Sequence, residues 1–255
     1  MSWMIDAPLA LIGLIILALL LAGMEIGFRC HGWLQKRHDG DEIATPDYLL
    51  SAMLGLLALL LGFTFSMALN RYESRRELVV QEANAIGTTW LRAQLVEGPG
   101  RDRMSQSLRR YVDARLVWSN DPSPVPSMAA TSDLQRQLWI EMRATLRGEP
   151  STQLSRGLMD AMNESFDLAS ARFAARSTHI PGEVLTALLL CSILSAMMLG
   201  YMMIGAGRRH RGATIVLLLL VGIVMLMIFD LDRPASGMIE VSQQPLIDLR
   251  ASISP

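Results

Sequence analysis

Residues 48–69 read YLLSAMLGLLALLLGFTFSMAL, and this stretch contains no Asp, Glu, Lys or Arg. A helix needs about 20 mainly apolar residues to cross the roughly 30 Å hydrocarbon core of a bilayer. An ionised side chain at the centre of such a helix costs at least about 2.5–3.5 kcal/mol on insertion scales. The stretch is therefore predicted to be a transmembrane helix.

Three further segments have a similar length and the same lack of charge: residues 7–24, 184–206 and 212–229. Buried helices of a soluble core are the alternative interpretation, but four such segments among 255 residues argue against it. No basic residue precedes the first segment and no clear small-x-small cleavage site follows it, so we expect a retained helix rather than a signal peptide. The predicted fold is all-α: a polytopic membrane protein with four transmembrane helices and a helical extramembrane bundle.

The charged residues lie between these segments and divide the chain into four parts. Residues 1–70 hold the first two transmembrane helices, residues 71–179 an extramembrane helical region, residues 180–229 the other two transmembrane helices, and residues 230–255 a C-terminal tail. Because two spans separate the extramembrane region from the tail, both are predicted to lie on one side of the membrane. Within the region, helices are predicted at 73–96, 102–118, 132–147 and 152–177, with a turn-rich linker at 120–126. The first of these helices is expected to continue the second span and carries an apolar stripe at Val79, Ala83, Ile86 and Trp90. Ser132 is expected to cap the third.

Two sets of arginines give opposite answers about which side that is. The positive-inside rule places short basic loops in the cytoplasm, and residues 207–212 form such a loop, GRRHRG. Arg71, Arg75 and Arg76 directly follow the second span and would instead put the extramembrane region in the cytoplasm. The charges alone leave the orientation open.

The sequence contains no constellation typical of an enzyme or of a resident cofactor. It has no phosphate-binding glycine loop, no G-x-S-x-G motif and no HExxH pair. Cys30, His31 and His38 could in principle hold a metal, but adjacent ligands in a loop are a weak signal, so we expect solvated side chains and no metal site. A net charge of −1 without a long basic run also argues against a nucleic-acid partner.

One face of the second predicted helix is rich in small and polar residues: Gly55, Leu59, Gly62, Ser66 and Asn70. Small residues let helices approach closely, and hydroxyl or amide groups bond across helices, so tight packing within one subunit is one interpretation. The other is a helix that lines a polar path in an oligomer, which Phe63 would narrow.

Charged residues are expected to gather at the membrane edge where this helix ends: Arg71, Arg75, Asp230, Asp232 and Arg233. We expect Arg71 to pair with Asp232 or Asp230 and so to tie the second span to the fourth. Alternatively, these arginines attract anions to the mouth of a pore.

Several motifs resemble the bestrophin superfamily. Residues 62–76, GFTFSMALNRYESRR, share its pattern of a Phe followed five residues later by Ala, and then by Arg and an aromatic residue. Residues 82–92 (EANAIGTTWLR), 230–237 (DLDRPASG) and 242–246 (SQQPL) are similar to the bacterial bestrophin-like group DUF4239. The resemblance to this group covers most of the chain, whereas that to true bestrophins covers mainly the second helix and its extension.

The resemblance implies a homo-oligomer in a bacterial inner membrane, with the pentameric bestrophin anion channels as its pattern. It implies that the second helix lines the pore, that Phe63 and Ser66 face it, and that the helical region is cytoplasmic. The chain departs from bestrophins at Thr64, Leu69 and Ser66, where Arg, Tyr and Asn are common. The sequence therefore predicts an oligomeric ion channel for small anions, with a non-conducting membrane scaffold or sensor, whose helical region binds a partner, as the alternative.

Overall fold

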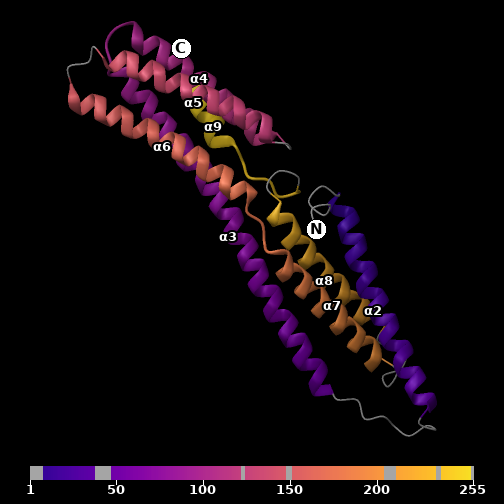
Figure 1. The fold of residues 1–255 in the computed structure, drawn as a ribbon. Helices are drawn as coiled ribbons and strands as arrows, with labels where there is room; N and C mark the ends of the chain where they lie inside the picture. Colours follow the sequence, from indigo (N-terminus) through magenta and orange to yellow (C-terminus); the bar gives the residue numbers. More distant parts are fainter. Residues whose placement is uncertain are drawn as a thin grey trace. The chain divides into compact units, whose positions relative to one another are not determined.

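The computed structural model describes residues 8–37, 47–121, 124–147, 151–203, 211–233 and 237–253. In these ranges the chain forms helices and no strand, as Figure 1 shows. The helices are α2 (Leu9–Arg37), α3 (Asp47–Gln94), α4 (Pro99–Asn120), α5 (Pro124–Leu146), α6 (Thr152–Ser177), α7 (Gly182–Met202), α8 (Arg211–Asp232) and α9 (Gln244–Ser252).

Four helical segments are long and apolar enough to cross a membrane: Leu9–Trp33, Tyr48–Gln94, Thr152–Met202 and Gly212–Asp232. The apolar part of the third segment is α7. The predicted all-α membrane fold with four spans is thus confirmed. The predicted continuation of the second span beyond residue 70 is also confirmed, because α3 is one helix of 48 residues.

The chain divides into two compact units. The first unit comprises Met1–Arg71, His179–Arg233 and Gly237–Ile239. The second unit comprises Tyr72–Thr178, Pro234–Ser236 and Glu240–Pro255, so it contains α9 as well as α4, α5 and α6. Each unit is described separately below.

In the first unit, α2, α7 and α8 lie side by side (Figure 1). Glycines make the contact between α2 and α7 very close. A Cβ atom added at Gly27 would lie 1.8 Å from the carbonyl oxygen of Met197, and one at Gly200 would lie 1.8 Å from that of Met24. No other residue fits these two positions, because the facing backbones themselves are in contact.

Near this contact, His31 is only 5% exposed, and its ring packs edge-on against that of Tyr201 at a centroid distance of 4.5 Å. Cys30 is exposed, as expected for a solvated residue. The prediction of a solvated His31 is wrong, because the helix extends through it to Arg37 and turns the ring towards α7. His38 lies outside the described residues.

The second unit has an apolar core between α3, α4, α5, α6 and α9. The predicted stripe on α3 supplies Val79, Ala83 and Ile86, all at most 5% exposed, with Trp90 packed against them. Leu246 of α9 is fully buried in the same core. The tail is therefore an integral part of this bundle.

The start of α5 differs from the prediction. The helix begins at Pro124 rather than at residue 132, because prolines are tolerated in a first turn, where their missing N–H would have no partner. Ser132 consequently lies inside α5, and its hydroxyl donates a hydrogen bond to the Met128 carbonyl oxygen rather than capping the helix.

Candidate functional site

The membrane half of α3 presents the small and polar residues to the outside of the single chain. Gly55, Gly62, Ser66 and Asn70 are exposed, and Phe63 is 63% exposed. A Cβ atom added at either glycine would meet nothing within 4 Å. One interpretation of this face was tight packing within one subunit. No such packing occurs at Gly55 or Gly62 among the described residues.

The opposite side of α3 is covered. Leu57, Thr64 and Ala68 are 4%, 3% and 0% exposed. Because a helix turns about 100° per residue, these three project from the side opposite to residues 55, 62 and 66. The hydroxyl of Thr64 donates to the carbonyl oxygen of Leu60 at 2.7 Å, so it is satisfied inside the helix and directed away from the exposed face.

The carboxylates at the end of α8 accept hydrogen bonds from backbone N–H groups. Asp230 accepts hydrogen bonds from the N–H groups of Met238 (2.7 Å) and Ile239 (3.1 Å). Asp232 accepts one from the N–H of Ile180 at 2.9 Å. Buried backbone donors need acceptors, and these lie next to the carboxylates.

The predicted pairing of Arg71 with either aspartate is wrong. Within the described part of the first unit, Nη1 of Arg71 is buried and has no hydrogen-bond partner. Arg233 is 6% exposed. Arg75 belongs to the second unit, where it donates to the carbonyl oxygens of Ala175 (3.1 Å) and Thr178 (2.8 Å) at the end of α6, where carbonyls have no helical partner.

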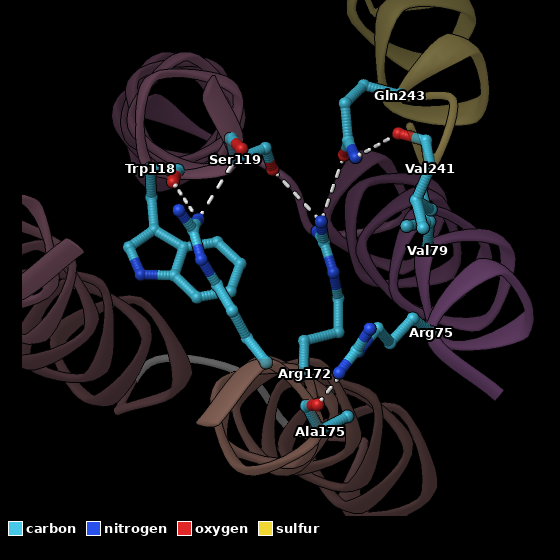
Figure 2. Close-up of a pocket in the computed structure, with 9 residues that line it drawn as sticks. Arg75, Val79, Trp118, Ser119, Arg172, Ala175, Val241 and Gln243 are labelled. Carbon is cyan, nitrogen blue, oxygen red and sulfur yellow. Dashed lines mark hydrogen bonds between the residues drawn. The ribbon is translucent and has the colours of Figure 1, made fainter. Parts of the chain in front are cut away.

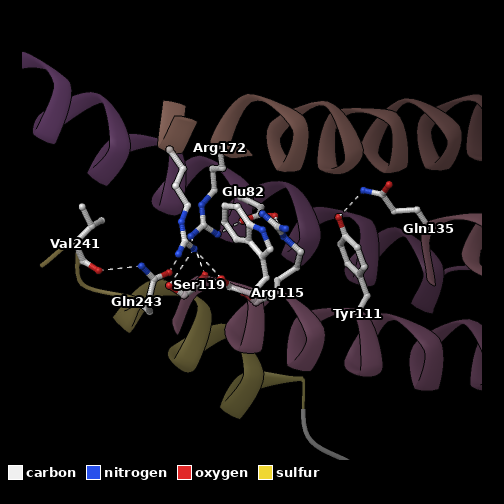
Figure 3. A network of polar contacts seen from close by, with 10 residues as sticks. Glu82, Tyr111, Arg115, Ser119, Gln135, Arg172, Val241 and Gln243 are labelled. Atoms are coloured by element: carbon white, nitrogen blue, oxygen red, sulfur yellow. Dashed lines mark hydrogen bonds and ion pairs between the residues drawn. The ribbon is translucent and has the colours of Figure 1, made fainter. Parts of the chain in front are cut away.

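A buried ionic network lies in the second unit (Figure 3). Glu82 of α3 is fully buried, and each of its carboxylate oxygens accepts a hydrogen bond from a different arginine. Arg115 of α4 donates through Nε at 2.5 Å, and Arg172 of α6 through Nη1. Arg172 also donates through Nη2 to Ser119 and to Gln243, both at 2.9 Å, so one guanidinium joins α6 to α4 and to the tail.

Three guanidinium groups surround the ring of Trp118. Their carbon atoms lie 4.2 Å (Arg115), 5.2 Å (Arg172) and 5.1 Å (Arg176) from the ring centroid, within the range of a cation–π interaction. Burial lowers the pKa of both Arg172 and Arg176, and Glu82 partly offsets this for Arg172. Burial also raises the pKa of the neighbouring Tyr111 to about 12.

A small cavity of about 40 Å³ adjoins this network (Figure 2). Arg75 reaches towards it from α3 and Arg172 from α6. Its lining residues are Arg75, Val79, Trp118, Ser119, Arg172, Ala175, Arg176, Val241 and Gln243.

Two structural features, the buried partners of Glu82 and the close contact of α2 with α7, have signals in the sequence that were not recognised. Glu82 falls within the helical stripe of Val79, Ala83 and Ile86, and an acid on a core-facing stripe needs a buried cation as its partner. Gly23 and Gly27 form a G-x-x-x-G motif, which is typical of closely packed transmembrane helices.

Comparison with known proteins places this architecture in a family. The model of the bestrophin-like domain matches residues 16–246. The chain belongs to the bestrophin-like family. The predicted resemblance is thereby confirmed. No curated protein matches the chain.

Solved structures agree with this bestrophin-like fold. A bacterial bestrophin homologue from Klebsiella pneumoniae is 14% identical, with 94% of this chain and 95% of that chain covered at a TM-score of 0.71. A single-residue variant of that homologue is also 14% identical, with coverages of 93% and 98% and a TM-score of 0.69. A structure described as a membrane protein variant is 13% identical, with coverages of 94% and 97% and a TM-score of 0.71. At these identities the likeness establishes the fold of this bestrophin-like chain.

Proposed function

We propose that the chain is one subunit of an oligomeric anion channel in which α3 lines the pore. The observation that carries the proposal is the uncovered face of α3, because Gly55, Gly62, Ser66 and Asn70 are exposed in the single chain. The homo-oligomer lies in the bacterial inner membrane, with a pentamer as the assembly found in bestrophins. No resident cofactor takes part.

The polar groups of this face would be unfavourable in contact with lipid. A hydroxyl or amide facing hydrocarbon has no hydrogen-bond partner, whereas in a pore it can replace part of the water shell of an ion. Ser66 and Asn70 supply such groups one helical turn apart, and the glycines leave room around them. Phe63 stands beside this face and narrows the path.

The pore formed in this way carries no ionised residue along residues 48–69. Thr64, at the position where bestrophins often have Arg, is buried on the covered side of the helix. We therefore expect anions to be stabilised by hydroxyl and amide dipoles alone. Selection among small monovalent anions should be weak.

Chloride flux into liposomes tests conduction, and a cysteine at Ser66 tests the role of the helix. In a background with Cys30→Ser and Cys191→Ala, a thiol reagent should block flux through Ser66→Cys. The matched control is Val216→Cys on α8, since Val216 is also exposed, at 57%, but lies on another span. Equal block of both variants would refute a pore along α3.

Cross-linking separates the channel from a scaffold that does not conduct. Neighbouring copies should form a disulfide through Ser66→Cys or Gly62→Cys if these faces meet around an axis. A monomer without flux would overturn the proposal. An oligomer that cross-links in this way but passes no chloride would favour the scaffold.

The orientation is proposed from the same family resemblance: the second unit is cytoplasmic. Ala130 of α5 is exposed and suits a labelling site. A membrane-impermeant thiol reagent should label Ala130→Cys only after the cells are opened. Labelling in intact cells would reverse the orientation.

A further inference from the structure

We infer that the cavity beside Trp118 binds one small monovalent inorganic anion, such as a halide or nitrate. The site lies inside the second unit and is distinct from the proposed pore face of α3. It does not depend on whether the protein conducts.

The side chains around Trp118 carry more positive than negative charge. Around Trp118, the guanidiniums of Arg115, Arg172 and Arg176 face two carboxylates, those of Glu82 and Asp121. Glu82 already binds two of the three cations. Arg75 also lines the cavity, so the positive charges exceed the negative charges by two, and a small monovalent anion would offset part of this excess.

The excess charge cannot be removed by loss of a proton. Arginine stays protonated in proteins, whereas a buried lysine can become neutral. Of the 23 basic residues in the chain, only Lys36 is a lysine, and all of those at this site are arginines. A buried cation without a counter-charge is costly, so the site favours an anion.

Some guanidinium N–H groups of the cavity bind no protein acceptor in the described part of the chain and remain available to an anion. Arg176 donates through Nη1 and Nη2 to the carbonyl oxygens of Trp118, Ser119 and Asp121, and Arg172 uses its Nη1 and Nη2 as given above. Among the described residues, neither of these two guanidiniums, which both line the cavity, donates through Nε to a protein atom. These donors are of the kind that anions accept.

The carbonyl groups at the end of α4 offer only partial compensation. They stand at the C-terminus of a helix, which carries about half a negative charge and is screened within a turn. They orient Arg176 over the indole ring without cancelling the positive charge of the cluster. The anion supplies the negative charge that these carbonyl groups do not provide.

The volume of the cavity suits a small ion. The cavity, of about 40 Å³, has room for a few water molecules, since one water molecule needs roughly 10–15 Å³. A halide or nitrate is of that size. A phosphate ester or a carboxylic acid with a side chain would extend beyond it, so a small inorganic anion fits it best.

The test uses the full chain purified in detergent, without any measurement of flux. Sodium gluconate is replaced stepwise by sodium chloride, bromide or nitrate at constant ionic strength, and thermal unfolding is followed. Each small anion should raise the unfolding midpoint by several degrees in a saturable manner, whereas gluconate should not. Bromide should also give an anomalous diffraction peak beside the guanidiniums of Arg172 and Arg176.

Two variants assign the effect to the cavity. Arg176→Gln removes one of the excess positive charges and a hydrogen-bond donor of the cavity, and should weaken the apparent affinity for chloride at least tenfold. Arg136→Gln, an exposed arginine paired with Asp133 on α5, is the matched control and should keep the wild-type dependence. If Arg176→Gln fails to fold, Arg176→Lys keeps the charge and should retain saturable binding.

The inference is overturned if the wild-type protein responds to chloride no more than to gluconate. It is equally overturned if Arg176→Gln keeps the full response. Failure of chloride flux in liposomes would leave this result untouched, so the site and the channel are tested separately.

Discussion

Replacing Glu82 by Gln should strongly destabilise the second unit. The side chain is fully buried, and those of Arg115 and Arg172 are only 3% and 6% exposed. Removing one partner of a buried ion pair costs about 3–5 kcal/mol, because the other charge stays buried without compensation. Here two cations lose one anion, and a Gln amide replaces one of the two acceptor oxygens, each of which binds a different arginine, by an NH2 donor. We therefore expect a loss in the upper part of that range, about 4–5 kcal/mol.

The assay is thermal unfolding of the purified protein, followed by tryptophan fluorescence and by recovery of a monodisperse peak in size-exclusion chromatography. For a unit of this size, a loss of 1 kcal/mol lowers the unfolding midpoint by roughly 3–5 °C. Glu82→Gln should thus lower it by more than about 10 °C. Glu77→Gln, an exposed change one and a half turns earlier on the same helix, should leave the midpoint nearly unchanged.

A midpoint for Glu82→Gln within a few degrees of the wild type would refute the reasoning. A second variant separates charge from shape: Glu82→Leu combined with Arg115→Met and Arg172→Met. Replacing a whole buried ionic group by apolar residues is often neutral or stabilising. The triple variant should therefore unfold at a higher temperature than Glu82→Gln; a lower one would show that polar bonds to Ser119 and Gln243 outweigh the charge effect.

Two further changes have clear expected outcomes. Gly200→Val should abolish folding, because its side chain would meet the backbone of Met24, whereas Gly222→Val, which has open space around its Cβ position, should be tolerated; the yield of monodisperse protein in detergent checks both. The raised pKa of Tyr111, about 12, means that the folded state keeps a proton which the unfolded state releases near pH 10, so stability should fall between about pH 10 and 12. Tyr111→Phe should reduce that loss by up to about 2–3 kcal/mol, and unfolding midpoints at pH 9 and 11.5 would measure it; an unchanged pH dependence would contradict the assignment.

The fold could be predicted from local pattern, whereas the contacts of polar residues could not. Apolar length gave the four spans, and helical spacing gave the core-facing stripe of Val79, Ala83 and Ile86. Both depend only on neighbours along the chain. The two partners of Glu82, Arg115 and Arg172, are 33 and 90 residues away on other helices, and nothing in the segment of Glu82 identifies them.

The membrane-edge aspartates show the same limit. Sequence proximity to a span suggested arginine partners for Asp230 and Asp232, yet both carboxylates bind backbone N–H groups. The turn that brings Met238 and Ile239 back to Asp230 depends on Gly237, since a Cβ there would lie 2.3 Å from a carboxylate oxygen of Asp230. Gly237 thus allows the backbone N–H groups of Met238 and Ile239 to reach the carboxylate of Asp230.

Residues 244–253 pack into the apolar core of the second unit. Leu246 and Ile253 are 0% and 2% exposed, and the carbonyl oxygen of Ile253 accepts a hydrogen bond from Arg109. A protease that clipped the chain just after residue 239 would uncover the core and strip Gln243 from Arg172. Resistance of this segment to digestion therefore reports directly on whether the bundle is intact.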